Sequence, residues 1–545
     1  MKSFSFSLSK LFIAICLFAI AFVTINEACT SIVVTKGASK KGSPIISYSC
    51  DGEFHPILSL IPAADHKPGE MFEMVNWLGQ KISIKQVPHT YRVVGLMNEH
   101  QVAIGESTWD GRPELENTKG MFDYYTLMLV ALQRSKTARE AISVMTSLVE
   151  EYGYGSTGES FSIADKEEAW VMEMIGPGVG GKGAIWVAVK IPDGYVSVHA
   201  NMSRIHEFPL NDPKNCIYSK NVISFATEKG YYDPANGKPF SFSEAYNPPT
   251  QEQVRYSARR VWSVFRRIAP SMNISPAYSS YEKDSKPYPL YIKPDNKLDV
   301  QDVIALHRDH YEGTEFDMTK DLAAGPFGVP DKWRPMKWQV DGKKYAWERP
   351  IATQQAGFVF VSESRANVPD EIGGVYWYGP DNPHTNFFTP LYSSITSLPK
   401  SYTTGRLDKF SRESAWWAFN FVANYANLRW SYMIQDIQKV QREIEADFFS
   451  KQAEVEAEAM KLLKENPAKV EKYLTNYCVE KAEAGIQKWW ELGDHLITKY
   501  NDGYIQDEKG NPHEVGYPES WLQTIPKEKL EKYRLRQERN GEGEL

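Results

Sequence analysis

The sequence predicts an α+β fold in which helices cover sheets of short strands. Alternating apolar and polar residues fill 29–110 and 155–200, the pattern of strands with one buried face. Apolar residues recur at helical spacing in four further segments, at 123–134, 137–150, 413–465 and 468–499. Helices packed on sheets in this way build a layered domain around a common core.

The composition is that of a folded protein of ordinary charge. The chain has 545 residues, 42% hydrophobic and 24% charged, with 62 Lys and Arg against 69 Asp and Glu. These values exclude a disordered chain, a collagen and a polytopic membrane protein. The net charge of −7 and the absence of a long basic run disfavour a nucleic-acid partner.

The first 28 residues have the pattern of a secretory signal peptide. Lys2 and Lys10 precede an apolar run at 11–25, and Ala28 supplies a small residue at the expected cleavage point. The run is short for a bilayer span, so we expect no stable membrane anchor. The interpretation is a secreted or periplasmic protein, with a retained anchor as the weaker alternative.

Removal of this segment places Cys29 at the N-terminus, where it can act as a nucleophile. A thiol attacks as the thiolate and needs a base. A terminal α-amine, with a pKa of about 7.7–8.0, can accept the thiol proton and later return it to a leaving amine. Such chemistry requires no metal or organic cofactor. A lipid on Cys29 would block it, but Asn26 and Glu27 are unlike a lipoprotein signal.

Three further cysteines remain in the chain after the signal, Cys50, Cys216 and Cys478. They are too few for a disulfide framework, although one bridge among them is open in an oxidising compartment. There is no paired Cys motif of the kind that binds zinc.

Cys29 opens a predicted β-hairpin. Residues 29–35 are rich in β-branched side chains, 36–43 contain Gly and Ser at turn positions, and 44–49 form a second strand. The second strand of a hairpin returns beside the start of the first. Asp51 is therefore expected next to Cys29, where it can orient the amine or the thiol; an ordinary Asp-Gly turn is the alternative.

Several segments resemble the cysteine dipeptidases of the N-terminal-nucleophile hydrolase superfamily, the dipeptidase A-like family. The resemblance begins with Cys-Thr-Ser-Ile-Val-Val at Cys29 and the Asp51-Gly52 turn. It continues in order through 95–108, 159–173, 199–205, 310–317, 324–328, 362–365 and Trp377. It covers about residues 29–500.

The resemblance implies a four-layer αββα sandwich of two antiparallel sheets, with Cys29 at one sheet edge. We expect one hydrolase domain at 29–524 with a helix-rich part at about 400–500, followed by a charged tail at 525–545. The implied activity is hydrolysis of dipeptides or short peptides. The oligomeric state is left open, a homo-oligomer included.

The resemblance also implies roles for particular residues. Cys29 would attack the peptide carbonyl and Asp51 would orient its amine. Asn201, at a strand end, would stabilise the oxyanion. Arg260 is the candidate for an Arg beside the nucleophile, with Arg204 as the alternative.

A dipeptidase also binds a free ammonium and a free carboxylate. Glu106 or Glu173 is expected to bind the first, and Arg204 the second. Family members often carry an Arg three residues before the Asp-Gly, where this chain has Tyr48, which puts the substrate preference in question. Two alternatives therefore stay open: an amidohydrolase acting on N-acyl amides, and a non-catalytic envelope lipoprotein.

Two other motifs are interpreted as structural. The Gly-rich segment 176–181 satisfies GxGxxG, but a strand follows it at 184–191 where a dinucleotide site needs a helix. His307 and His310 with Glu312 lack a metalloprotease pattern, so a packing or substrate-side role is favoured over a metal. The chain also has no GxSxG motif of a serine hydrolase.

Overall fold

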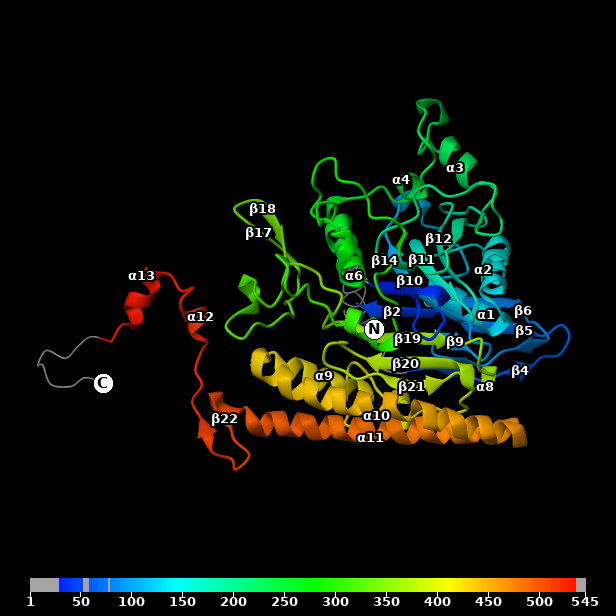
Figure 1. The fold of residues 1–545 in the computed structure, drawn as a ribbon. Coiled ribbons are helices and arrows are strands. Elements are labelled where there is room, and N and C mark those ends of the chain that lie inside the picture. Colours follow the sequence, from blue (N-terminus) through cyan, green and yellow to red (C-terminus); the bar gives the residue numbers. More distant parts are fainter. Residues whose placement is uncertain (1–28, 52–57, 77–78, 536–545) are drawn as a thin grey trace, which may run out of the picture.

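The computed structural model describes residues 29–51, 58–76 and 79–535, so the expected signal peptide lies outside the described residues. Two large sheets form the centre of the molecule (Figure 1). The seven-stranded sheet has the order β16 (Tyr291–Ile292), β14 (Val196–Ala200), β1 (Thr30–Val34), β2 (Ile45–Asp51), β19 (Ala356–Ser364), β20 (Gly374–Pro380) and β21 (Thr389–Tyr392). The eight-stranded sheet has the order β15 (Cys216–Tyr218), β13 (Ile185–Lys190), β12 (Ala169–Ile175), β11 (Gly158–Ala164), β10 (Ala103–Trp109), β9 (Met97–Asn98), β8 (Val93–Val94) and β3 (Leu60–Ile61).

The two sheets face each other, and helices cover their outer faces. Strands β1 and β2 contact β10 and β11 of the other sheet, and every residue of the four strands except Thr108 is buried. Helices α1 (Tyr124–Arg134) and α2 (Ala138–Tyr152) contact the eight-stranded sheet. Helices α7 (Val300–His307), α9 (Ala415–Ala426), α10 (Trp430–Glu465) and α11 (Pro467–Lys499) contact the seven-stranded one. The expected α+β sandwich is confirmed.

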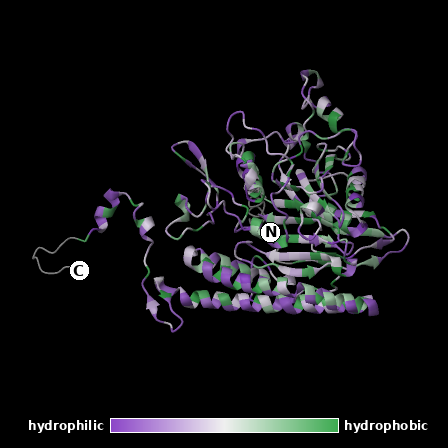
Figure 2. Cartoon of the chain, viewed as in Figure 1, coloured by the Kyte–Doolittle hydropathy of each residue, from purple (hydrophilic) through white to green (hydrophobic). Residues whose placement is uncertain are grey.

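The helices begin where their sequences provide caps. The Asp123 carboxylate accepts from the Thr126 amide at the start of α1, and the Thr137 hydroxyl accepts from the Glu140 amide at the start of α2. Asn466 caps α11, which has a proline in its first turn. In Figure 2, α10 and α11 carry apolar residues in stripes between polar ones, as expected for helices that cover a sheet on one side.

The prediction of one long helix at 413–465 is wrong, because the structure divides this segment into α9 and α10. The break falls at Arg429, whose φ of −154° and ψ of 57° are not helical. Its guanidinium donates to the carbonyl oxygens of Gly503 and Tyr504, which follow α11. A tertiary contact thus interrupts a segment whose local pattern is helical throughout.

The position of Cys29 also differs from the expected sheet edge. Strand β1 pairs with β14 on one side and β2 on the other, so Cys29 precedes an interior strand. Strand β2 in turn pairs with β19, which lies far downstream in the sequence. The nucleophile candidate is therefore held between two neighbouring strands.

The Gly-rich segment 176–181 connects the antiparallel strands β12 and β13, which confirms the predicted hairpin loop. Shorter helices are α3 (Val222–Glu228), α4 (Phe242–Tyr246), α5 (Gln251–Gln253), α6 (Arg259–Ile268), α8 (Asp370–Gly373), α12 (Glu519–Leu522) and α13 (Lys527–Leu530). Two-stranded hairpins or pairs are β4 (Ala64–Asp65) with β7 (His89–Thr90), β5 (Met71–Val75) with β6 (Lys81–Lys85), β17 (Lys337–Val340) with β18 (Lys343–Ala346), and β22 (Ile505–Gln506) with β23 (Pro512–His513).

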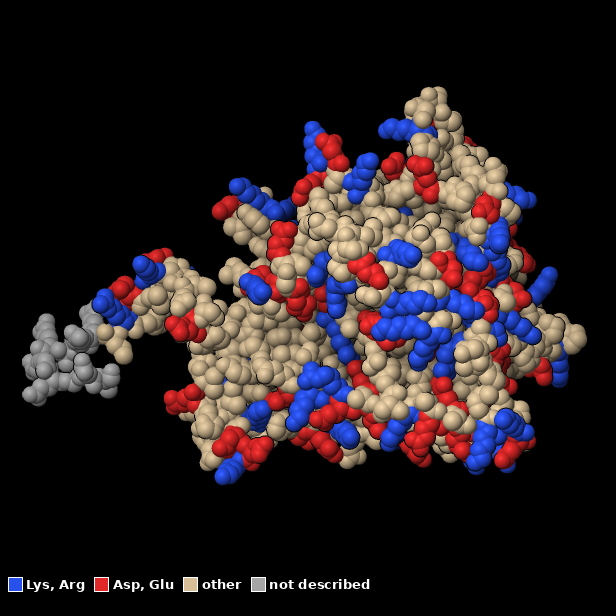
Figure 3. Space-filling model, viewed as in Figure 1, with Lys and Arg blue, Asp and Glu red and all other residues tan. Residues whose placement is uncertain are grey.

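The segment that carries α12 and α13 runs away from the sandwich in Figure 1. Acidic and basic side chains are interspersed on the face seen in Figure 3. Among the described residues, no helix combines the length and the apolar character that crossing a membrane requires.

Candidate active site

The expected hairpin brings Asp51 to the start of β1. In the β1–β2 register Thr30 pairs with Ser49, so Cys50 and Asp51 follow beside Cys29. The Ser49 hydroxyl accepts from the Thr30 amide at 3.1 Å and lies 3.2 Å from Oδ2 of Asp51, to which it donates. Ser49 therefore links the first strand to the Asp51 carboxylate.

Arg260 joins Cys29 to Asn201. Its Nη1 donates to the Cys29 carbonyl oxygen and, at 2.8 Å, to the Thr30 hydroxyl. Its Nη2 donates to Oδ1 of Asn201 at 2.7 Å. Burial, and then the charge of Arg349, lower the pKa of Arg260 to about 9. Arg260 thus joins three of the four residues expected to be catalytic, and the fourth, Asp51, is linked to them through Ser49.

The backbone before Arg260 is unusual. Residues Val254–Ala258 form a π-helical turn that runs directly into α6. The Tyr256 carbonyl of this turn accepts from Nε of Arg260 at 2.9 Å, which fixes the plane of the guanidinium. Such turns occur frequently at functional sites.

Glu106 reaches the Cys29 thiol from the opposite sheet. Its Oε1 lies 3.5 Å from Sγ of Cys29, and the Tyr48 hydroxyl donates to the same oxygen. The Tyr48 hydroxyl is itself 3.9 Å from Sγ. Burial, together with the nearby charge of the Cys29 thiolate, holds the pKa of Tyr48 well above its usual value, so the hydroxyl remains a donor.

A glycine allows this close approach of the two sheets. A Cβ at Gly105, next to Glu106 on β10, would lie 2.9 Å from Cβ of Tyr48. Only a residue without a side chain fits there unless Tyr48 shifts. Gly105 therefore permits the contact between β10 and β2 that sets Glu106 against the thiol.

Asp51 is fully buried and forms an ion pair with Arg349. Burial raises the pKa of this carboxyl, while Arg349 and Arg260 oppose the rise. Arg349 lies 298 residues further along the chain and was not predicted as a site residue. No local pattern around it separates it from other arginines.

Glu173 and Arg204 make their hydrogen bonds away from Cys29. The Glu173 carboxylate accepts from the Ser203 hydroxyl and from the Arg204 and Ile205 amides. The Arg204 guanidinium donates to three main-chain carbonyl oxygens, of Val198, Tyr288 and Pro289. These two residues hold the segment that follows β14, and no hydrogen bond or ion pair between described residues joins either one to Cys29.

The two histidines of the 307–312 segment lie in different surroundings. Nε2 of His307 lies 2.7 Å from the Ser47 hydroxyl, and burial lowers its pKa to about 3, as in a packed neutral imidazole. His310 and Glu312 instead meet His384, with one potential ligand atom from each within 4.8 Å of the others. His384 was not singled out from the sequence, because it lies far from the other two along the chain.

Cys216 and Cys478 are free, buried thiols. Burial raises the pKa of each to about 12, so neither ionises readily near neutral pH. Neither takes part in a disulfide, so the bridge left open among Cys50, Cys216 and Cys478 is not formed.

Comparison with known proteins defines the class. The model of peptidase family C69 matches residues 67–443, more than half of the chain, and the chain belongs to that family. The match begins downstream of Cys29. Among relatives, a "Probable dipeptidase" of Salmonella dublin is 26% identical, over 68% of this chain and 81% of the relative.

Further relatives carry similar names. A "Probable dipeptidase" of Latilactobacillus sakei is 25% identical, over 73% of this chain and 80% of its own length. A "Probable dipeptidase B" of Streptococcus pyogenes serotype M1 is 24% identical, over 74% of this chain and 79% of its own length.

Proposed function

We propose that this protein is a dipeptidase in which Cys29, freed as the N-terminal residue, is the nucleophile. The observation that carries the proposal is the position of Arg260, which binds the Cys29 carbonyl and the Asn201 side chain at once. The family match and the names of the relatives support peptide hydrolysis.

The reaction follows from the chemistry of a terminal thiol. The α-amine of Cys29 accepts the thiol proton, and Sγ attacks the peptide carbonyl to form a tetrahedral oxyanion, which Asn201 stabilises. The amine then gives its proton to the leaving nitrogen. Water, deprotonated by the same amine, hydrolyses the thioester and restores the thiol.

Glu106 supports a substrate with a free ammonium. Its carboxylate faces Cys29 across the two sheets, where the amino group of a short peptide lies when its first carbonyl is attacked. An acyl chain in that position would meet a charged group without gaining an ion pair. This favours dipeptides over the N-acyl amides that remain the alternative substrates.

A substrate panel tests the proposal. The purified protein is expected to hydrolyse dipeptides faster than the N-acetylated forms of the same dipeptides. Cys29→Ser is expected to lower kcat by at least about 100-fold, since a hydroxyl is a weaker nucleophile, with the melting temperature unchanged. Cys216→Ser, the matched control at a buried thiol, retains activity. Turnover of N-acyl amides alone, or an unaffected Cys29→Ser variant, contradicts the proposal.

The mature N-terminus provides a second test. We infer secretion with removal of residues 1–28, because the mechanism needs the Cys29 amine unblocked. Intact mass and N-terminal sequencing of the exported protein are expected to give a free Cys29. A different first residue, or a lipid on Cys29, would rule out the mechanism.

A further inference from the structure

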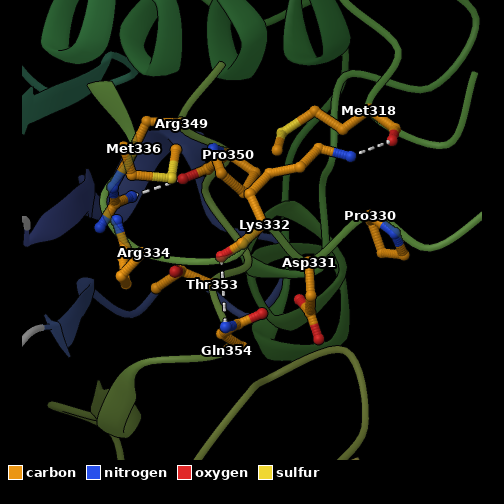
Figure 4. Close-up of a pocket in the computed structure, with 10 residues that line it drawn as sticks. All are labelled: Met318, Pro330, Asp331, Lys332, Arg334, Met336, Arg349, Pro350, Thr353 and Gln354. Carbon is orange, nitrogen blue, oxygen red and sulfur yellow. Dashed lines mark hydrogen bonds between the residues drawn. The ribbon is translucent and has the colours of Figure 1, made fainter. Parts of the chain in front are cut away.

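A pocket rich in cationic residues lies beside Asp51. It is small and open to solvent, and Met318, Pro330, Asp331, Lys332, Arg334, Met336, Arg349, Pro350, Thr353 and Gln354 line it. Figure 4 shows the guanidinium groups of Arg334 and Arg349 directed toward one another on one side of the pocket. The charge of Arg349 acts on Arg334, and two like charges near one another favour an anion between or beside them.

The three cationic side chains that line the pocket, Lys332, Arg334 and Arg349, differ in their hydrogen bonds and ion pairs. Lys332 donates to the Met318 and Val329 carbonyl oxygens and pairs with Asp321, so its three donors are engaged. Arg349 pairs with Asp51 and also donates to the Pro350 carbonyl.

Arg334 differs from both. It is exposed, and it makes no hydrogen bond or ion pair with any residue that the structure describes. A guanidinium carries five N–H donors in a fork that matches a carboxylate. Arg334 therefore offers the pocket an unused carboxylate-binding group.

A second donor lies nearby. The Tyr256 hydroxyl is buried and has no hydrogen-bond partner among the described residues. Burial raises the pKa of Tyr256 to about 12, although the charges of Arg255 and Arg334 oppose the rise. Tyr256 belongs to the π-helical turn whose carbonyl oxygen binds Arg260, so its backbone is joined to the candidate active site.

The one acidic lining residue does not cancel the positive charge. Asp331 accepts from Nδ2 of Asn427, and burial raises the pKa of its carboxyl, which favours the neutral form. The pocket thus presents more positive than negative charge.

The pocket is linked to the candidate nucleophile through a series of hydrogen-bonded residues. Arg349 pairs with Asp51, Asp51 accepts from Ser49, and Ser49 accepts from the Thr30 amide next to Cys29. In a dipeptide the carboxylate belongs to the residue after the scissile bond, about 3.8 Å further along the chain. A carboxylate site must therefore lie near the nucleophile, and Arg334 is near enough to Asp51 for the charge of that carboxylate to act on its guanidinium.

We propose that Arg334, supported by the Tyr256 hydroxyl and the charge of Arg349, binds the free α-carboxylate of the substrate. This inference rests on the proposed function and assigns to Arg334 the role that the sequence suggested for Arg204. It makes Arg334 the residue that restricts the enzyme to substrates ending one residue after the scissile bond.

The test compares alanyl-alanine with its C-terminal amide, which lacks the carboxylate. Wild type is expected to prefer the acid in kcat/KM. Arg334→Ala is expected to lower kcat/KM for the acid by about 10- to 100-fold, with the amide nearly unaffected, so that the preference disappears. Arg334→Lys keeps part of it, and Arg442→Ala, at an exposed arginine on α10, keeps all of it. An unchanged acid-to-amide ratio in Arg334→Ala overturns the proposal.

A binding measurement separates this inference from the proposed function. Calorimetry on Cys29→Ala, with and without Arg334→Ala, uses the same two ligands and requires no turnover. Weaker binding of the acid alone in the double variant supports the carboxylate site even if wild type hydrolyses neither ligand, in which case only the proposed function fails. Equal affinities of the two variants for the acid overturn the inference, whatever the activity of wild type.

Discussion

Sγ of Cys29 lies 3.5 Å from Oε1 of Glu106, although Cys29 precedes a strand of one sheet and Glu106 lies in the other. The contact places a carboxylate against the candidate nucleophile, and Tyr48 holds that carboxylate by donating to the same oxygen. A negative charge here repels a second anion and attracts an ammonium. The relationship therefore connects the packing of the two sheets to the charge of the substrate.

Glu106→Gln is expected to raise KM for dipeptides about 10- to 100-fold, because the substrate ammonium loses its ionic partner while the acceptor for Tyr48 remains. The N-acetylated dipeptide, without an ammonium, is expected to change little. Steady-state kinetics on both substrates checks this, with Glu443→Gln, at an exposed position of α10, as control. An equal loss for both substrates would assign Glu106 to another role.

Arg260→Lys is expected to lower kcat about 100-fold with little change in KM. A single ammonium cannot reproduce the forked contacts to the Cys29 carbonyl, the Thr30 hydroxyl and Asn201. The split between kcat and KM distinguishes positioning of the nucleophile from general loss of structure. Arg266→Lys on the same helix is the control. A change in KM without a change in kcat in Arg260→Lys would contradict the assignment.

Arg349→Met is expected to lower the free energy of unfolding by about 3–5 kcal/mol, because it leaves the buried Asp51 carboxylate without its partner. Asp51→Asn combined with Arg349→Met is expected to lose less than the sum of the two single variants. Denaturant titration of the four proteins measures the coupling. Additive losses would mean that the pair does not act as a unit.

Stability is expected to fall as the pH drops from about 6.5 toward 3. Burial lowers the pKa of His199 to about 3, while in the unfolded chain the imidazole titrates near 6.5. Between these values the unfolded state binds the extra proton, so the stabilisation present above pH 6.5 is lost by about 1.4 kcal/mol for each pH unit.

Unfolding free energies measured between pH 7 and 4 check this expectation. His199→Gln is expected to show a shallower loss than wild type, and His495→Gln, at an exposed histidine of α11, the same loss as wild type. Identical slopes in all three proteins would show that His199 is not held neutral by burial.

Chelation is expected to leave dipeptide hydrolysis unchanged, since the proposed steps use a thiol and an amine. The check is kcat/KM before and after dialysis against EDTA, with metal content measured in parallel. If chelation abolished activity and zinc restored it, the result would contradict this expectation and would indicate a metal site at His310, Glu312 and His384, whose potential ligand atoms lie close together.

The local sequence determined the elements that depend on neighbours along the chain. The hairpin of β1 and β2 follows from β-branched strands around a Gly-containing turn, and it alone places Asp51 beside Cys29. Helices α1, α2 and α11 begin and end within about two residues of the predicted bounds, because apolar spacing and capping residues are local signals.

Only the tertiary structure decided which distant side chains meet. Strand β19 pairs with β2 across some 300 residues of sequence, a partnership that no periodicity encodes. The same packing pairs Arg349 with Asp51 and brings Glu106 against the Cys29 thiol. It also decides the roles of two arginines, because Arg204 donates to main-chain carbonyl oxygens while Arg260 donates to the carbonyl oxygen of Cys29. The sequence by itself therefore determined the hairpin that follows the candidate nucleophile and most of the helices, because these depend on short-range pattern, and the family resemblance implied the layered fold. The charges around the candidate nucleophile depend on contacts between sheets and loops, which only the folded chain creates.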